Sequence, residues 1–284
     1  MKKAILVISF GTSYIESLER SIFKVEDNIR REYREFDVFR AFTSHFIIKK
    51  LKEKHSLDIW TPEEALKILK EAKYEEVIVQ PLHLIAGEEF TYIKTVIEGY
   101  KDKFNSIKLG RPIFYYQGIE ELPQDYSEFI KSINDILDKN KLTVMVGHGT
   151  AHPAGASYGC LQTVLKEEGY DNVFVGTIEG YPSFNSVLKL VKEKKVNELT
   201  LMPLLLVAGD HAQNDIGSDE EDSWKSMFEK EGIKTKVIMK GLGEYPKFNQ
   251  LYINRIDDLI CGRYEGAGET KKGHKKKHKV VVNS

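Results

Sequence analysis

The sequence contains little cysteine, no long apolar run and almost no net charge. Its 284 residues include two cysteines, Cys160 and Cys261, which are too few for a disulfide framework and fit a reducing compartment. No apolar stretch approaches the roughly 20 residues that a membrane-spanning helix needs. The run AILVISF at residues 4–10 follows two lysines, but it is too short for a signal peptide and no cleavage site follows it. These absences predict a cytoplasmic protein.

Charge and length narrow the class of protein further. Lysine and arginine number 42 against 43 aspartates and glutamates, so the composition gives no reason to expect nucleic acid or an anionic membrane as a partner. The length favours two domains, which we place at residues 1–125 and 126–260. Residues 261–284 form a basic tail of low complexity, which we interpret as a disordered or added extension.

Short β-rich runs alternate with longer amphipathic stretches along the chain. Continuously apolar strands separated by helices indicate parallel sheets covered on both faces. The sequence therefore predicts an α/β fold of two similar doubly wound domains around a central cleft. Helix starts are expected at Thr61, where a proline follows in the first turn, and at Ser218, which heads a capping box. The expected strands are residues 4–10, 36–42, 75–85, 141–147, 172–178 and 198–207, with weaker signals at residues 108–115 and 234–241.

The two halves repeat one another at the ends of their expected strands. SFGTS corresponds to GHGTA at an offset of 138 residues, and VQPLHLIAGEE corresponds to LMPLLLVAGDH at an offset of 122. FRAFTS aligns more loosely with FVGTIE at an offset of 135. Ligands of doubly wound sheets bind outside the carboxyl ends of the strands, so these segments should converge on one cleft. The paired positions are Phe10 with His148, Ser44 with Glu179, and Glu89 with His211.

Three of these positions carry metal-binding side chains in the second half alone. His148, Glu179 and His211 would form a mixed nitrogen and oxygen site, which suits divalent cobalt, nickel, iron or zinc. No local ligand pattern joins the three, so their convergence depends on the predicted cleft. A single histidine at a strand end is more often a capping or substrate-orienting residue than a ligand, and this alternative stays open for each.

Several motifs, in order over about residues 1–260, resemble those of one family. MKKAILVISFGTSY, FRAFTS, LHLIAGEE, GHGTAHP, EGYPS, LMPLLLVAGDHAQND and GLGEYP are similar to the anaerobic-type sirohydrochlorin cobaltochelatases of cobalamin biosynthesis. The resemblance implies a class II chelatase, which inserts Co²⁺ into sirohydrochlorin or precorrin-2 without ATP or accessory subunits. It also implies that His148, Glu179 and His211 are the metal ligands.

The resemblance leaves the metal and the turnover open. Nickel or iron insertion into the same tetrapyrrole is one alternative, because metal preference depends on geometry and supply. A non-catalytic metal or tetrapyrrole carrier of this fold is the other. The expected partners are sirohydrochlorin and divalent cobalt, with no nucleic acid, no membrane and no cofactor beyond the cobalt substrate. The sequence does not reveal whether the chain forms a homo-oligomer.

Catalysis and substrate binding should draw on both walls of the cleft. Insertion removes two pyrrole protons, and His148 on the metal side is expected to accept one near neutral pH. Glu89 would face the tetrapyrrole from the opposite wall, where a carboxylate could manage pyrrole protons. The carboxylates of the substrate are expected at the helix N-termini after both Gly-Thr motifs and near Arg40, which could equally be a solvated surface residue. The expected substrate-binding residues are Ser9, Thr12, Ser13, Arg40, Gly149 and Thr150.

Two further histidines have competing interpretations. His83 interrupts an otherwise buried strand, which is more typical of a core or interface histidine than of one that helps bind the substrate or haem. His152 lies four residues after His148, so it is an alternative ligand, although Pro153 after it favours a structural role in the loop.

Removal of residues 264–284 should leave the melting temperature and the metal-insertion rate almost unchanged, because the strand and helix pattern ends near Leu259. Thermal unfolding and an insertion assay on the shortened chain test this. A large loss of either would show that the tail packs on the fold.

Overall fold

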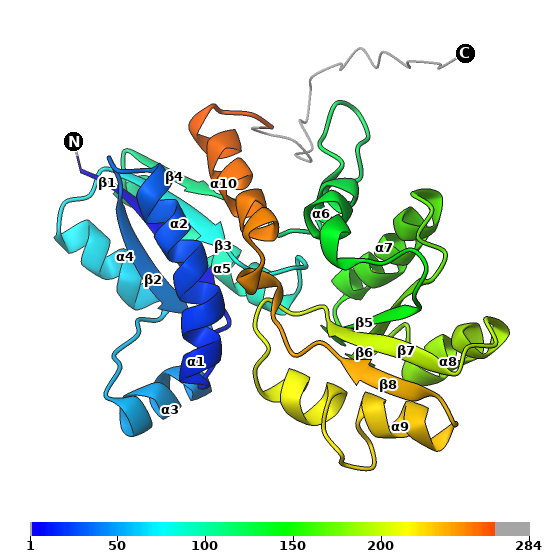
Figure 1. Cartoon of the computed structure of the whole chain (residues 1–284). Coiled ribbons are helices and arrows are strands. Elements are labelled where there is room, and N and C mark those ends of the chain that lie inside the picture. Colours follow the sequence, from blue (N-terminus) through cyan, green and yellow to red (C-terminus); the bar gives the residue numbers. More distant parts are fainter. Residues whose placement is uncertain (1, 265–284) are drawn as a thin grey trace.

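The computed structural model describes residues 2–264, and the expectations for residues 265–284 lie outside this range. Each half contains one four-stranded parallel sheet, in the order β2-β1-β3-β4 in the first and β6-β5-β7-β8 in the second (Figure 1). The shared topology confirms the predicted α/β fold of two similar doubly wound units. The strands are β1 (Lys3–Ser9), β2 (Asp37–Phe42), β3 (Glu76–Pro81), β4 (Ser106–Leu109), β5 (Thr143–Gly149), β6 (Val173–Glu179), β7 (Glu198–Pro203) and β8 (Lys234–Val237).

Helices cover both faces of each sheet. In the first half they are α1 (Ile15–Leu18), α2 (Lys24–Glu32), α3 (His45–His55), α4 (Pro62–Glu71) and α5 (Glu88–Glu98), with the π-helical turn η1 (Glu19–Phe23) between α1 and α2. In the second half they are α6 (Asp125–Ile133), α7 (Ala156–Glu167), α8 (Phe184–Glu193), α9 (Trp224–Lys230) and α10 (Pro246–Ile260). No helix within residues 2–264 is long and apolar enough to cross a bilayer.

One of the two expected helix starts is confirmed and the other is wrong. Thr61 caps α4, where its side chain accepts from the Glu64 amide and the Glu64 carboxylate accepts from the Thr61 amide. Ser218 does not begin a helix. The cap of α9 is Ser223, whose hydroxyl accepts from the Ser226 amide and donates to the Ser218 carbonyl. Ser218 thus belongs to the loop that positions the true cap.

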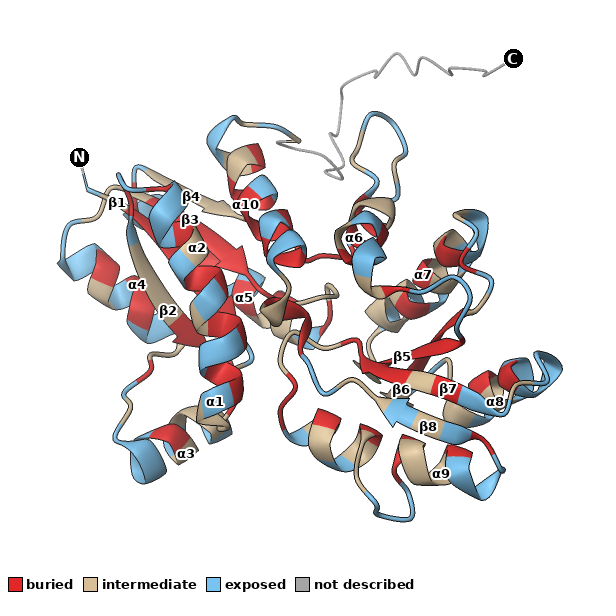
Figure 2. Cartoon of the chain, viewed as in Figure 1, coloured by how far each residue is buried: buried red, intermediate tan, exposed pale blue. Residues whose placement is uncertain are grey.

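Alternate residues of the central strands pack into different cores. In β1, Ile5 and Val7 join the largest core, whereas Leu6 points to the opposite face, beneath α4 and α5. In β5, Met145 joins the largest core and Val144 packs on the other face, beneath α8 and α9. The largest core therefore contains residues of both halves and continues across their junction (Figure 2).

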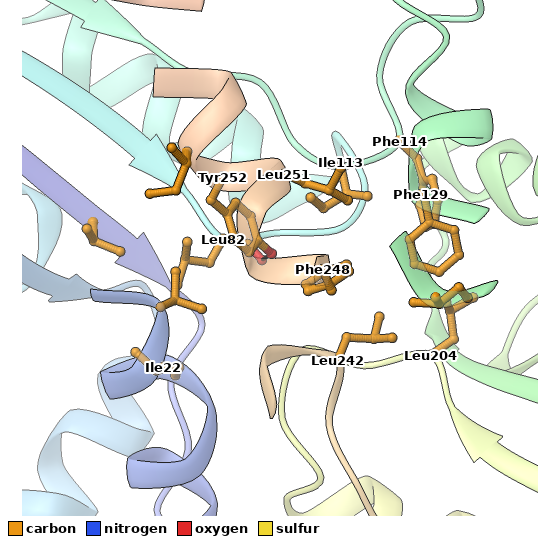
Figure 3. Packing of buried hydrophobic residues seen from close by; sticks show 14 of the residues in the cluster. Ile22, Leu82, Ile113, Phe114, Phe129, Leu204, Leu242, Phe248, Leu251 and Tyr252 are labelled. Atoms are coloured by element: carbon orange, nitrogen blue, oxygen red, sulfur yellow. Dashed lines mark hydrogen bonds between the residues drawn. The ribbon is translucent and has the colours of Figure 1, made fainter. Parts of the chain in front are cut away.

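Aromatic side chains fill this junction (Figure 3). The rings of Phe129 on α6 and Phe248 on α10 meet edge to face with centroids 6.0 Å apart, and Tyr252 packs against Phe248 at 5.6 Å. The Tyr252 hydroxyl donates to the Leu82 carbonyl at the end of β3 over 2.9 Å. Helix α10 thus ties the first sheet to the first helix of the second half.

A buried ion network fixes the same junction. Asp125, at the start of α6, accepts from Arg255 of α10 at 2.9 Å and from Arg111 at 3.0 Å. Arg111 also pairs with Asp258 at 2.7 Å. Asp125 and Arg255 are fully buried, and each keeps one other ion-pair partner, Arg111 for Asp125 and Glu128 for Arg255. Removing either residue would therefore leave the other buried charge only partly compensated, which is destabilising.

The C-terminal helix α10 packs against both halves, although it follows the second half in sequence. Helix α10 contacts α2 and β3 as well as α6. The boundary between residues 125 and 126 therefore stays a prediction. Tyr264, the last described residue, packs its ring 6.2 Å from the ring of Tyr116 and 5.4 Å from the Arg111 guanidinium. We therefore expect any stability lost in the 264–284 truncation to come from this contact.

His83 lies in the segment that follows β3, and its main-chain carbonyl accepts from the Ile113 amide. Both ring nitrogens are buried, and within the described residues neither has a hydrogen-bond partner. Burial lowers the pKa of His83 to about 4, because the charged imidazolium would lose its hydration without gaining a partner. The placement fits a core or interface histidine, but one whose ring nitrogens are not satisfied by hydrogen bonds within the described residues.

His83 should make folding less stable in acid. Between about pH 6.5 and pH 4 the unfolded chain binds a proton that the folded chain does not, so stability falls as the pH falls through this window. The full effect is about 3 kcal/mol. Urea unfolding at both pH values should show that His83→Leu loses less stability than the wild type. His45→Leu, at an exposed histidine, should behave like the wild type. Equal losses in wild type and His83→Leu would contradict this account.

Candidate functional site

Two glycines position His148 at the carboxyl end of β5. A Cβ at Gly147 would lie 2.5 Å from the ring of Tyr158, which packs beneath the strand. Gly149 has φ +88°, and a Cβ there would lie 1.7 Å from the Glu179 carbonyl oxygen of β6. Any larger residue at either position would displace the strand end. The GHG sequence therefore fixes the backbone on both sides of the imidazole.

The segment after β7 brings His211 to the same place. The Ser17 hydroxyl donates to the Ala208 carbonyl at 2.9 Å, and a Cβ at Gly209 would lie 3.0 Å from the Thr12 hydroxyl oxygen. The chain then enters the π-helical turn Ala212–Ile216, which His211 precedes directly. Contacts with the first half therefore hold the AGDH sequence.

The imidazoles of His148 and His211 lie next to each other, with centroids 4.4 Å apart and planes at 86°. His148 Nδ1 is 3.0 Å from the Gly149 carbonyl oxygen, and His211 Nδ1 is 2.7 Å from Asp215 Oδ2. A carbonyl or carboxylate oxygen only accepts, so each neutral ring carries its proton on Nδ1. Each Nε2 therefore presents a lone pair, which is the arrangement that a metal-binding histidine needs.

Glu179 ends β6 beside the histidine pair. Its backbone pairs with Gly149 in the sheet, and its side chain is exposed. Within residues 2–264, no three His, Cys, Asp or Glu side chains are grouped closely enough to hold a metal ion. The structure thus brings together two of the three predicted ligands. The role of Glu179 as the third ligand stays a prediction.

Loops of the two halves interlock on both sides of the site with the same pattern. The Thr150 hydroxyl donates to Glu88 Oε2 at 2.7 Å, and the Tyr14 hydroxyl donates to Asp210 Oδ1 at 2.9 Å. The bond from Thr150 lowers the pKa of Glu88, and the bond to Asp210 raises the pKa of Tyr14. The 122-residue offset pairs Glu88 with Asp210. The repeat could therefore have revealed Glu88, which the sequence reasoning missed in favour of Glu89.

Glu89 lies in the first turn of α5, where it is half-buried. The 122-residue offset pairs it with His211, and it directly follows Glu88, the first residue of α5, which accepts from the Thr150 hydroxyl. Glu89 therefore lies one residue from a contact with the segment that follows His148. Its role toward pyrrole protons stays a prediction.

The predicted substrate-binding residues have different placements. Ser9 and Thr12 are buried. The Thr12 hydroxyl accepts from the Tyr14 amide and helps to shape the loop, whereas the Ser9 hydroxyl has no hydrogen-bond partner within the described residues. Arg40 forms an ion pair with the fully buried Glu26. The positive charge of Arg40 is therefore paired inside the protein. Neither the substrate-binding interpretation nor the solvated-surface interpretation predicted this pair. Ser13 and Thr150 are half-buried, and Gly149 is buried.

His152 has a structural partner of its own. Its Nδ1 accepts from the Ala154 amide at 3.1 Å, and its own amide donates to the Thr150 hydroxyl at 3.0 Å. These bonds cap the short 3₁₀ turn Pro153–Gly155. The placement fits the structural role in the loop that Pro153 suggested.

A match to a known family identifies the family to which this chain belongs. The family model described as "Cobalt chelatase (CbiK)" matches residues 3–261, nearly all of the described chain. The chain belongs to the cobalt chelatase family.

Curated relatives agree with this assignment. The chain is 36% identical over 263 residues to the sirohydrochlorin cobaltochelatase of Salmonella typhimurium, covering 92% of this chain and 97% of the relative. It is 27% identical over 264 residues to the sirohydrochlorin cobaltochelatase CbiKC of Nitratidesulfovibrio vulgaris, covering 91% of each.

Two solved structures share the fold of this cobalt chelatase family member. SirB from Bacillus subtilis, solved with Fe³⁺, superposes with a TM-score of 0.62 at 16% identity over 94% of this chain and 98% of that one. CbiX, described as the terminal enzyme of sirohaem biosynthesis in denitrifying bacteria, gives a TM-score of 0.51 at 12% identity over 89% and 98%. At these identities the likeness shows the fold alone.

Binding of Co²⁺ should weaken as the pH falls, because only neutral imidazoles act as ligands. With two histidine ligands the dependence should approach two protons per metal in acid. His211→Ala should reduce it toward one, whereas Glu179→Gln should weaken binding and keep the slope. The measurement is Co²⁺ titration by visible absorption or calorimetry between about pH 5 and 8.

His152→Ala is the matched control, because His152 is a nearby histidine whose Nδ1 is already used in the loop. It should keep the affinity and the slope of the wild type. If His211→Ala instead matches the wild type, then His211 is not a ligand and His152 becomes the better candidate.

Proposed function

We propose that this chain inserts Co²⁺ into sirohydrochlorin, or its precursor precorrin-2, without ATP, in the anaerobic route to cobalamin. The observation that carries the proposal is the pair of imidazoles with free Nε2 atoms at the meeting edge of two chelatase-like halves. Membership of the cobalt chelatase family and 36% identity to a sirohydrochlorin cobaltochelatase support the same substrate and metal.

The pair suits a metal that is cargo rather than a resident ion. Two neutral nitrogens, with the Glu179 carboxylate as the proposed third ligand, leave coordination positions for water and for pyrrole nitrogens. The Asp215 carboxylate accepts from His211 Nδ1, which orients the ring and strengthens Nε2 as a donor. The main-chain carbonyl of Gly149 orients His148 without adding charge. The two rings therefore differ in donor strength, and His148 is the weaker ligand of the two.

This difference gives His148 a second task. Insertion exchanges two pyrrole protons for one Co²⁺, so two protons must leave the macrocycle. While His148 Nε2 binds the metal, it cannot accept a proton. Once Co²⁺ moves to the pyrrole nitrogens, the lone pair is released and can take one proton on the metal side. Glu89, at the edge of the first sheet, would take the other.

Insertion of another metal, or carriage without turnover, remains the alternative function. Side-by-side assays with Co²⁺, Ni²⁺ and Fe²⁺ under multiple-turnover conditions separate these cases. A chelatase converts many equivalents of sirohydrochlorin per chain, whereas a carrier stops at one. A single equivalent of product at saturating metal would overturn the proposal.

His148→Ala should reduce kcat/KM for Co²⁺ insertion by roughly 100-fold or more, because it removes both a ligand and a proton acceptor. Glu89→Ala should cost less, roughly 10-fold, because Glu89 has only the proton task. Initial rates from the absorbance of the metallated product give both values. A larger loss in Glu89→Ala than in His148→Ala would reverse the assignment of the two walls.

A further inference from the structure

Two aromatic side chains are highly exposed on the surface of the described chain. Tyr181 is 79% exposed and Phe46 is 70% exposed, more than any other large apolar residue within residues 2–264. The 135-residue offset that pairs Ser44 with Glu179 also pairs Phe46 with Tyr181. Each half therefore presents one exposed aromatic ring shortly after the strand beside its central strand, Phe46 in the first turn of α3 and Tyr181 in the loop that precedes α8.

Tyr181 sits on a loop with little freedom to move. The amide and hydroxyl of Thr177 both donate to the Pro182 carbonyl, at 2.8 and 3.2 Å, which closes the loop on the end of β6. Gly180, with φ +118°, lies so close that a Cβ on it would be 3.4 Å from the Thr150 carbonyl oxygen. This loop therefore packs against the GHGT segment that carries His148.

Phe46 is equally well fixed in the first half. It lies in the first turn of α3, where the Ser44 hydroxyl accepts from the Ile47 amide. The Ser44 amide donates to the Phe10 carbonyl, so α3 begins against the segment after β1. The 138-residue offset pairs Phe10 with His148. Phe46 thus stands beside the first-half counterpart of the histidine segment, as Tyr181 stands beside the histidine segment itself.

The chemistry of these positions points to a flat, conjugated ligand. Exposed aromatic rings on well-ordered backbone give contact area at small cost in conformational entropy when a ligand covers them. Lys50 lies 5.8 Å from the centroid of Phe46, which adds a positive charge next to the ring. A tetrapyrrole offers both complements, because its macrocycle has a conjugated face and its rim carries carboxylates.

We propose that Phe46 and Tyr181 are substrate-positioning residues, one from each half, that pack against the tetrapyrrole and hold it over His148 and His211. The inference rests on the proposed function, because it names the residues that the same substrate would contact. It assigns the two rings to macrocycle binding and gives them no part in holding the metal.

The test is a titration of the full chain with metal-free sirohydrochlorin, in which the absorbance of the sirohydrochlorin reports binding. Phe46→Ala and Tyr181→Ala should each raise the dissociation constant and KM by roughly 3- to 10-fold, with kcat largely kept. The effects in the double variant should multiply, because the two positions lie in different halves. Phe46→Tyr and Tyr181→Phe should restore wild-type binding. Affinity for Co²⁺ alone should stay unchanged in every variant.

Ile119→Ala is the matched control. Ile119 is 64% exposed, but it lies in the turn closed by the bridge between Gln117 and Gln124, away from the strand ends of the site. It should bind and turn over like the wild type. Wild-type dissociation constants in both alanine variants would overturn the inference while leaving the proposed function intact. A wild-type chain that binds sirohydrochlorin but never turns over would overturn the proposed function, and the alanine variants would still test the binding role.

Discussion

Asp125 and Arg255 are both fully buried, and their ion pair determines how the two halves of this cobalt chelatase family member meet. Arg255 comes from α10, at the end of the fold, and Asp125 from α6, at the start of the second half. A charge pair of this kind contributes little net stability, but it strongly disfavours any arrangement in which one partner loses the other. The aromatic contacts around Phe248 then fill the remaining space. The contacts that set the relative position of the two sheets therefore involve neither histidine of the site.

With the halves fixed, the site can be symmetric in structure and asymmetric in chemistry. Thr12 and Thr150 occupy equivalent positions, and each meets the loop after the third strand of the other half. The positions that face the substrate differ, because the second half places His148 where the first half places Phe10. A planar substrate between two like walls needs a metal on one side only. The two halves therefore share one scaffold and differ in the residues at the chemically active positions.

The sequence predicted the elements well where the signal was local. Apolar runs separated by amphipathic stretches predicted the strands. The repeat alone predicted that His148 and His211 lie at the carboxyl ends of strands in one cleft. Tertiary contacts were out of reach. Nothing in the sequence near Arg40 shows that Glu26, fourteen residues earlier, is buried beneath it. Ser218 precedes a run of acidic residues, as a helix cap often does, but Ser223 caps α9, where the Trp224 that follows it is packed in the core of the second half.

The histidine pair also shows why a chelatase site differs from a structural metal site. A closed site with four ligands would hold Co²⁺ too tightly to release it to pyrrole nitrogens. Here the imidazoles of His148 and His211 are held firmly, by the Gly149 carbonyl and by Asp215. Within the described residues, however, only these two of the three predicted ligands lie close together. Rigid placement keeps the entropic cost of binding low, while the small number of ligands keeps the metal exchangeable. The surrounding protein therefore makes the two ligands rigid, and the small number of ligands makes metal binding weak. A metal that is handed on in each turnover requires both.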